Sequence, residues 1–348
     1  MPEASSQTSA SAIPLPGRQF WYIACPSSQL QQQPLAARVF DVDLALFRDA
    51  QGRPGALLDR CAHRAVRLSL GRVTAGNLAC GYHGWQYARD GQCAHIPSLC
   101  AGEGAPHGVA VTAYPCVEQD GYVWVWTGEG PPTPSVPNRI EEFDGNAWLQ
   151  GTVLFNCSAC MLIENQFDAA HPAFAHEGTH PAYFFSRLRG MPETEFEVRM
   201  EEQGFAAFIP VVDPDQPIPD EPRSLTRLEL PARVYIRQVA EPLVNFRLVL
   251  HVVPTGPQTC RLEWLQHNPK GAEGITWVEK ETRLIEQDRL LLESAQPAYG
   301  PGVGFSERSV PADFVTMLVR RALRASAQPD WRAELRHLPG RRIVRLRS

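Results

Sequence analysis

The sequence lacks long apolar runs. No stretch approaches the roughly 18 consecutive apolar residues of a membrane-spanning helix, and the first residues are small and polar, without the apolar core of a secretory signal. We therefore expect a soluble, cytoplasmic protein in which residues 1–17 form a flexible leader. A protein that is not exported needs no disulfide framework, so the nine cysteines are expected to be thiols or metal ligands.

An excess of positive charge is also missing. Lys and Arg number 33 against 38 Asp and Glu, which gives a net charge of -5, and the arginines form no long positive tract. This balance argues against nucleic acid as a partner. The chain has no dinucleotide-binding or flavin-binding motif, so any electrons it takes from NAD(P)H must arrive through another protein.

The pattern of apolar residues predicts two regions of different character. Up to Trp126 the chain reads as short strands separated by turns, and residues 122–126 form an aromatic, β-branched strand. The Gly- and Pro-rich residues 128–134 cannot continue a helix or strand, which predicts a domain boundary near residue 130. Beyond it, strands and helices occur in separate runs, which favours an α+β domain over a βαβ one. The predicted strands are 232–236, 243–253 and 261–267, and the predicted helices are 275–295 and 312–326.

Two short motifs in the β-rich region pair a cysteine with a histidine. Cys61 and His63 form the first pair, and Cys80 and His83 form the second. Such spacings let each pair converge from one tight loop, and a β-rich domain can bring two loops together over one metal centre. The alternative, a pair of core cysteines beside incidental histidines, rarely produces this paired spacing. The spacing alone allows either a structural zinc site or an iron-sulfur cluster.

A second group of polar residues surrounds His171. On a helix, Asn165, Asp168 and His171 are three residues apart and share one face. Pro172 must end or kink that helix, so His176 is expected on the following turn, folded back toward His171. Two imidazoles need one carboxylate to complete the facial triad of non-haem Fe(II) sites, which leaves coordination positions open for O2. The alternative is a polar helix end with solvated histidines.

The helix predicted at 275–295 supplies a carboxylate on its apolar face. Leucine and isoleucine residues stand three and four positions before and after Asp288, so Asp288 projects toward the core. Burying a carboxylate costs several kcal/mol unless it is paired or binds a metal. Asp288 is therefore either a metal ligand or the partner of a buried arginine. Glu286 and Glu293 point to other faces and are weaker candidates.

Two smaller features have simpler interpretations. Cys157 and Cys160 form one Cys-x-x-Cys pair with no second pair to complete a four-cysteine site, so we expect both to pack in the core. His180 is expected to be a pocket or surface histidine and not a further ligand.

The paired motifs carry a resemblance to a known family. Cys-x-His-Arg followed by Cys-x-Tyr-His-Gly-Trp resembles a Rieske [2Fe-2S] domain. The resemblance implies that Cys61 and Cys80 bind one iron of the cluster and that His63 and His83 bind the other. Imidazoles in place of two thiolates reduce the negative charge of the cluster and raise its potential.

The group of polar residues around His171 extends this resemblance. The run Glu-Asn-x-x-Asp-x-x-His-x-x-x-x-His resembles the catalytic signature of the Rieske non-haem iron oxygenases, and the later acidic helix resembles the segment with their third ligand. The resemblance implies that His171, His176 and Asp288 bind a mononuclear Fe(II). It also implies that Asp168 is the acid that bridges the two metal centres.

The resemblance covers about residues 18–326 and is to the α (terminal oxygenase) subunits of the short class that includes dicamba and vanillate O-demethylases and N-demethylases. It implies a Rieske domain at 18–130 and a catalytic domain at 131–348 with a helix-grip (START-like) fold, in which a curved antiparallel sheet surrounds the iron-bearing helix. It also implies a homotrimer, in which the cluster of one subunit serves the iron of the next.

The implied activity is hydroxylation or oxidative demethylation of a small organic substrate, aromatic or heterocyclic, with O2 and electrons relayed from NAD(P)H by a separate reductase or ferredoxin. Monooxygenation or demethylation is expected ahead of dioxygenation. Two alternatives belong to other classes: a Rieske electron carrier with a degenerate second domain, and a ligand-binding protein stabilised by zinc. The polar residues around His171 disfavour the electron carrier. A brown colour of the purified protein would exclude the zinc protein.

Overall fold

In the computed structural model the chain forms two compact units. The first is Arg18–Asn146, and the second is Ala147–Ser348 together with the residues up to Gly17. The structure describes residues 13–100, 102–104, 107–140, 148–180, 190–191, 193–209, 224–240, 244–267, 274–300 and 303–347. Within these ranges no helix is both long enough and apolar enough to cross a membrane.

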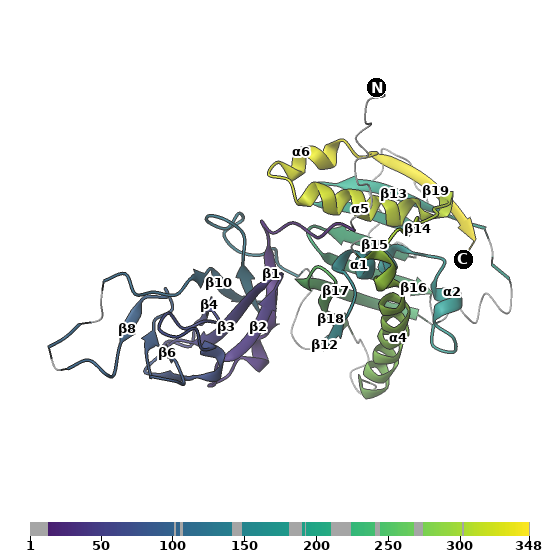
Figure 1. The fold of residues 1–348 in the computed structure, drawn as a ribbon. Coiled ribbons are helices and arrows are strands. Elements are labelled where there is room, and N and C mark those ends of the chain that lie inside the picture. Colours follow the sequence, from purple (N-terminus) through teal and green to yellow (C-terminus); the bar gives the residue numbers. More distant parts are fainter. Residues whose placement is uncertain are drawn as a thin grey trace, which may run out of the picture. The chain divides into compact units, whose positions relative to one another are not determined.

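The first unit is β-rich, as predicted (Figure 1). Its described residues form three small antiparallel sheets, with the strand orders β1-β11-β10, β2-β3-β4-β9 and β5-β6-β7-β8. The predicted aromatic strand is β11, and all five of its side chains are buried. The strands are β1 (Trp21–Pro26), β2 (Leu35–Val39), β3 (Val42–Arg48), β4 (Pro54–Leu58), β5 (Arg72–Thr74), β6 (Asn77–Ala79), β7 (Gln86–Tyr87), β8 (Cys93–His95), β9 (Ala113–Tyr114), β10 (Cys116–Gln119) and β11 (Tyr122–Trp126).

The junction between the units lies later than the expected boundary near residue 130. Asp120, in the turn between β10 and β11, has a fully buried side chain. Its carboxylate accepts hydrogen bonds from the Ile140 amide at 2.7 Å and from the Arg139 guanidinium at 2.8 Å. Residues 139–140 therefore pack against the first unit, because they satisfy a buried charge that belongs to it.

The second unit is built on one large antiparallel sheet, which confirms the α+β prediction. Its described part has eight strands in the order β12-β18-β17-β16-β15-β14-β13-β19. The strands are β12 (Trp148–Phe155), β13 (Glu193–Glu201), β14 (Gly204–Ile209), β15 (Ser224–Glu229), β16 (Arg233–Ala240), β17 (Val244–Gly256), β18 (Thr259–His267) and β19 (Arg341–Arg347). The strands predicted at 232–236, 243–253 and 261–267 are β16, β17 and β18.

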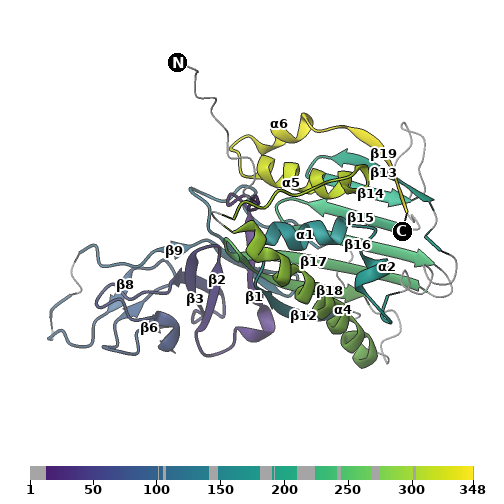
Figure 2. The same cartoon turned by 45° about the vertical axis from the view of Figure 1, so that its right-hand side comes forward.

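Helices cover one face of this sheet, as Figures 1 and 2 show. They are α1 (Ala159–Phe167), α2 (Pro172–Ala175), α4 (Gly274–Ala295), α5 (Phe314–Ser326) and α6 (Trp331–Arg336). The ring of Phe167 in α1 lies 4.9 Å from the ring of Phe205 in β14, centre to centre. Residues that share the Phe205 face, such as Leu250 and Trp264, are buried, so this face of the sheet packs against the helices.

Helix α1 ends earlier than its sequence pattern predicted. The backbone of Asp168 is extended (φ -84°, ψ 96°), and its carboxylate accepts hydrogen bonds from the amides of Ala170 and His171. Pro172 then begins α2, at a helix position where proline loses no hydrogen bond. The prediction that Asp168 and His171 share one helical face is therefore wrong, because the Asp168 side chain bonds to the main chain in place of a further helical turn.

Candidate metal centres

The two Cys/His loops of the first unit have the same backbone pattern. In both loops the cysteine amide donates to the carbonyl five residues later at 2.8 Å, and the amide four residues later donates to the cysteine carbonyl. That fourth residue is Ala65 in one loop and Gly84 in the other, and both have positive φ, 56° and 73°. The loops therefore present Cys61 and Cys80 from equivalent positions.

The four predicted ligands divide into a buried sulfur pair and an exposed imidazole pair. Cys61 and Cys80 are 4% and 2% exposed and belong to one apolar cluster. His63 and His83 are exposed, and their rings lie 4.7 Å apart, centre to centre. A single tetrahedral zinc holds its ligand atoms within roughly 4 Å of one another. No three of these four residues meet even a 4.8 Å limit, so the set fits a two-iron cluster with one iron at each end.

Two aromatic residues for which the sequence predicted no role contact this centre. Trp85 stacks on His63, with 4.5 Å between ring centres and 5° between planes. The Tyr87 hydroxyl accepts from the Ala62 amide and lies 3.2 Å from Cys61 Sγ, so its own proton can point to the sulfur. Burial and then Cys61 raise the pKa of Tyr87, which keeps that proton in place. Hydrogen bonds to sulfur tune a cluster's potential. The sequence signal that could have found Tyr87 is its position four residues after His83.

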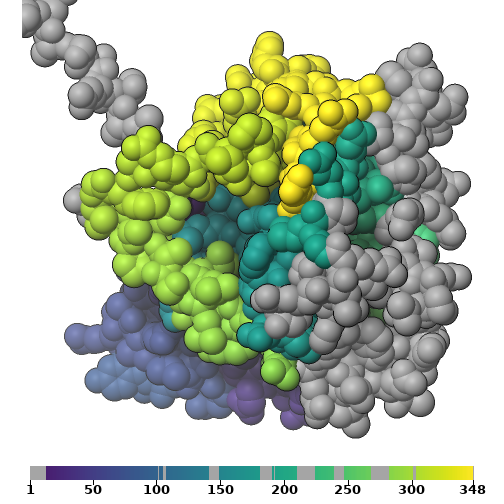
Figure 3. All heavy atoms as spheres, turned by 90° about the vertical axis from the view of Figure 1, so that its right-hand side faces the viewer, coloured from purple at the N-terminus to yellow at the C-terminus, as the bar shows by residue number. Residues whose placement is uncertain are grey.

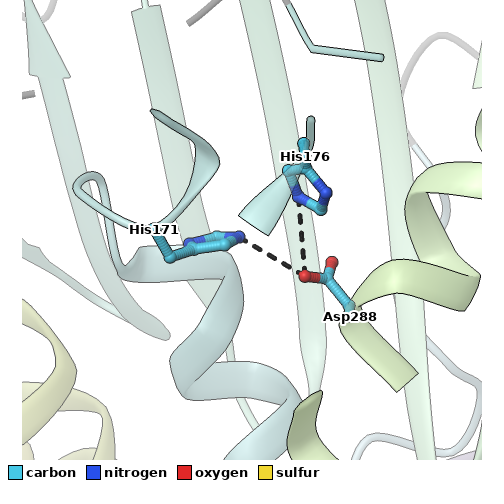
Figure 4. Close-up of side chains that lie close together, drawn as sticks. All are labelled: His171, His176 and Asp288. Atoms are coloured by element: carbon cyan, nitrogen blue, oxygen red, sulfur yellow. Dashed lines mark ion pairs between the residues drawn. The ribbon is translucent and has the colours of Figure 1, made fainter. Parts of the chain in front are cut away.

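The second centre joins three residues from two distant parts of the chain (Figure 4). His171 and His176 flank α2, and Asp288 lies on α4. The Nε2 atoms of both histidines lie 3.5 Å from Asp288 Oδ1, and the three ligand atoms lie within 4.8 Å of one another. Among the residues that the structure describes, this is the one group with such geometry. Two imidazole nitrogens and a carboxylate facing one point repel each other unless a cation or proton lies between them, so the set fits a divalent metal.

The environment of this centre sets the protonation of its histidines. Nδ1 of His171 lies 2.6 Å from the Asp168 carbonyl, which can only accept, so Nδ1 carries a proton and Nε2 is the metal-facing atom. Burial opposes the charged form of His171, but Asp288 and the Asp168 carbonyl outweigh it and raise the pKa. For His176 burial dominates and lowers the pKa. His171 must therefore release a proton more often than His176 when a metal binds.

The alternatives to Asp288 have other partners. Glu286 forms an ion pair with Arg289, and Glu293 accepts from the Asn156 amide at 2.8 Å. Among the described residues, no arginine is within ion-pair distance of Asp288, whose carboxylate instead accepts from the Asn165 side chain at 3.2 Å. Of the three carboxylates, the structure therefore brings Asp288 alone to the histidines.

Asp168 contacts the His171 imidazole through its main chain. Its carbonyl bonds the imidazole, while its carboxylate bonds two amides. His180 lies near the group but outside it, with its ring centre 5.8 Å from that of His176. Cys157 and Cys160 are fully buried, as predicted for core residues.

One face of the second unit has a recess (Figure 3). Figure 3 shows a recess among the green and yellow-green atoms of α4, α5 and the loop between them, with teal atoms from the α1 region at its floor. The His171 side chain keeps 20% of its surface exposed, against 6% for His176, so the centre is more open on the His171 side.

Comparisons with known proteins agree with both centres. Residues 20–115 match the Rieske [2Fe-2S] domain family and include all four predicted cluster ligands. The chain is 30% identical to chlorophyllide a oxygenase of Chlamydomonas reinhardtii over 87% of its own length and 47% of the relative. It is 34% identical to the oxygenase component of dicamba O-demethylase of Stenotrophomonas maltophilia over 49% of its length and 51% of the relative. The chain carries a Rieske [2Fe-2S] domain and is related to the Rieske non-haem iron oxygenases.

Two solved oxygenase-type structures share the fold of this chain. Dicamba monooxygenase bound to dicamba superposes with a TM-score of 0.72 at 22% identity, over 89% of this chain and 97% of that one. NdmA of Pseudomonas putida CBB5 with caffeine gives 0.74 at 22% identity, over 91% and 95%. The chain spans about half the length of the curated relatives named above. The fold confirms the predicted α-subunit architecture of a Rieske domain followed by a catalytic domain with a large antiparallel sheet.

Proposed function

We propose that this chain is a terminal oxygenase that hydroxylates or oxidatively demethylates a small aromatic or heterocyclic substrate. The observation that carries the proposal is the convergence of His171, His176 and Asp288 in a chain that also has both Cys/His loops. Relatives named for demethylation of dicamba and vanillate and for oxygenation of chlorophyllide support this substrate class. For a methyl ether the balance is R-OCH3 + O2 + 2 electrons + 2 protons to R-OCH2OH + H2O, and the hemiacetal then releases formaldehyde.

The chain's own residues divide the work between the two centres. When bound, the cluster would supply single electrons and the mononuclear Fe(II) would bind O2. Cys61 and Cys80 would hold one iron in the core, while the exposed His63 and His83 would hold the other where electrons enter and leave. Three protein ligands at the second centre leave the remaining coordination positions open. A separate reductase or ferredoxin would relay electrons from NAD(P)H, since the chain has no motif for that cofactor.

The same proposal includes the assembly and location expected from the sequence, a homotrimer and the cytoplasm. In the trimer, Asp168 would connect His171 of one subunit with the cluster ligand His83 of the next, which orients both imidazoles. Asp168→Asn keeps an acceptor for the two amides, so both metal centres should assemble normally. Oxidation of the pre-reduced cluster in a single turnover should then slow sharply. Unchanged oxidation would contradict the bridging role, and loss of the mononuclear iron would make Asp168 a direct ligand.

Metal analysis and oxygen uptake test the proposal. The purified chain should be brown and hold about three irons and two acid-labile sulfides. It should consume O2 with NADH and a surrogate reductase when aromatic, N-methyl, O-methyl or alicyclic compounds are added in turn. About two irons with no substrate-stimulated uptake would indicate an electron carrier, and a colourless zinc protein would indicate a binding protein.

A further inference from the structure

Gln287 lies beside Asp288 on α4 and reaches the segment that carries His176. Its Oε1 atom lies 3.3 Å from Nδ1 of His176 and 2.8 Å from the Thr179 hydroxyl. Its Nε2 atom donates to the Glu177 carbonyl at 3.4 Å. One side chain therefore makes three contacts with residues 176–179, and it comes from the same helical turn as the third metal ligand.

The orientation of this amide follows from what each partner can donate or accept. A carbonyl oxygen only accepts, so Nε2 of Gln287 must face Glu177 and Oε1 must face His176. Because Oε1 also only accepts, the proton of the His176 imidazole lies on Nδ1. The lone pair is left on Nε2, the atom that faces Asp288 at 3.5 Å.

The two histidines differ in what holds them. The Nδ1 atom of His171 bonds to a main-chain carbonyl, which no change of the Asp168 side chain removes. The Nδ1 atom of His176 bonds to a side chain, and the single proton of the Thr179 hydroxyl is directed either to that side chain or to the His176 carbonyl at 3.1 Å. His176 is thus the imidazole whose orientation depends on replaceable side chains.

We propose that Gln287 is a positioning residue that fixes the tautomer and the ring orientation of His176 for metal binding, and that Thr179 holds the Gln287 amide in place. The inference rests on the proposed function, because it takes His171, His176 and Asp288 as the iron site. A partner of this kind typically changes metal affinity by about 10- to 100-fold when it is removed.

The test measures Fe(II) affinity of the mononuclear site in the full chain with its cluster intact, by competition with a coloured chelator. A second readout is the electron paramagnetic resonance spectrum of the site with nitric oxide added to Fe(II). Gln287→Leu should weaken Fe(II) binding about 10- to 100-fold and broaden the spectrum. Gln287→Glu keeps the acceptor for His176 but loses the donor to the Glu177 carbonyl, so it should recover part of the affinity that Gln287→Leu loses. Glu286→Gln, on the same helix but paired with Arg289, is the matched control and should change neither.

The outcomes separate positioning from general support of the fold. Fe(II) binding by Gln287→Leu within about twofold of wild type, with an unchanged spectrum, overturns the proposal, as does an equal loss in Gln287→Glu. If Gln287→Leu fails to fold by circular dichroism, Thr179→Val decides: weaker Fe(II) binding supports the proposal and unchanged binding overturns it. A wild-type chain that binds no mononuclear Fe(II) contradicts the proposed function itself, a result distinct from variants that bind as well as wild type.

Discussion

The two metal centres of this chain are assembled over very different distances. The four predicted cluster ligands lie within residues 61–83, on two loops with the same hydrogen-bond pattern. The second centre joins His171 and His176 to Asp288, more than 100 positions further along the chain. When a centre is built from neighbouring loops, the spacing of its ligands in the sequence predicts it. A ligand on a distant helix can be identified only from the packing that places it beside the other ligands.

The residues that support the two centres show the same contrast. Buried Asp59, two residues before Cys61, accepts from the amide and hydroxyl of Ser69, both at 2.7 Å and ten positions away. In the second unit, Glu164 of α1 pairs with Arg320 of α5, 156 positions away. The cluster loops are thus stabilised by hydrogen bonds between residues close in the sequence. The helix before His171 is stabilised by an ion pair between residues far apart in the sequence.

Loss of a cluster thiolate should have the largest effect. Cys61→Ser should remove the visible absorption and all turnover, because a hydroxyl does not replace a thiolate ligand. Absorption spectra and iron analysis measure this. Cys100→Ser changes an exposed thiol outside the loops and should leave the spectrum intact. A normal spectrum in Cys61→Ser would remove that residue from the cluster.

Loss of the distant ligand should affect one centre only. Asp288→Ala should keep a coloured, reducible cluster but hold about two irons in place of about three, with turnover reduced more than about 100-fold. Iron analysis and O2 uptake measure both effects. Glu293→Gln is the carboxylate control, since Glu293 bonds the Asn156 amide. If Asp288→Ala retains its third iron, the carboxylate ligand lies elsewhere.

Loss of the ion pair between Glu164 and Arg320 should destabilise the second unit. Arg320→Leu leaves the Glu164 carboxylate buried without that partner, which should lower the free energy of unfolding by about 3 to 5 kcal/mol. Urea denaturation compared with the exposed-site control Arg321→Leu measures it. A loss no larger than in the control would show that solvent, or a proton on the Glu164 carboxyl, compensates for the lost guanidinium.

The same variant has a defined pH dependence. Burial raises the pKa of Glu164 in spite of the Arg320 guanidinium, so the folded state holds this proton more tightly than the unfolded state. The stability from such a group is fully present below the ordinary pKa of glutamate and is lost as pH rises through the raised value. Removing Arg320 raises the pKa further. The deficit of Arg320→Leu should therefore be larger at about pH 8 than at about pH 5.

Loss of the hydrogen bonds between Asp59 and Ser69 should have the smallest effect. Asp59→Ala leaves the Ser69 amide without its acceptor and should cost about 1 to 3 kcal/mol, with the cluster still formed. The temperature at which the visible absorption disappears measures this loss. Asp59→Asn keeps an acceptor and should recover part of it, while Asp90→Ala, in an exposed turn, is the control. A loss as large as that of Arg320→Leu would contradict the contrast between local and long-range support.

The sequence by itself determined the features that depend on neighbours along the chain. The spacing of Cys61, His63, Cys80 and His83 indicated a metal centre before any fold was known, and residues 122–126 were predicted as a strand and form β11. The apolar stripe around Asp288 marked it as a buried carboxylate, because helical periodicity is local. The break after α1 was missed, since it depends on the Asp168 side chain bonding to two amides, which competes with a pattern that favours helix.

Only the tertiary structure decided which groups meet. Asp288, Glu286 and Glu293 are all acids on one helix, and contacts with His171, Arg289 and Asn156 separate them. Tyr87 and Gln287 belong to no motif, and their contacts with Cys61 and His176 come from strand pairing and helix packing. The physical reason is that hydrogen-bond partners are selected by distances of about 3 Å in space, whereas spacing along a chain constrains such distances only within a loop or a single helix.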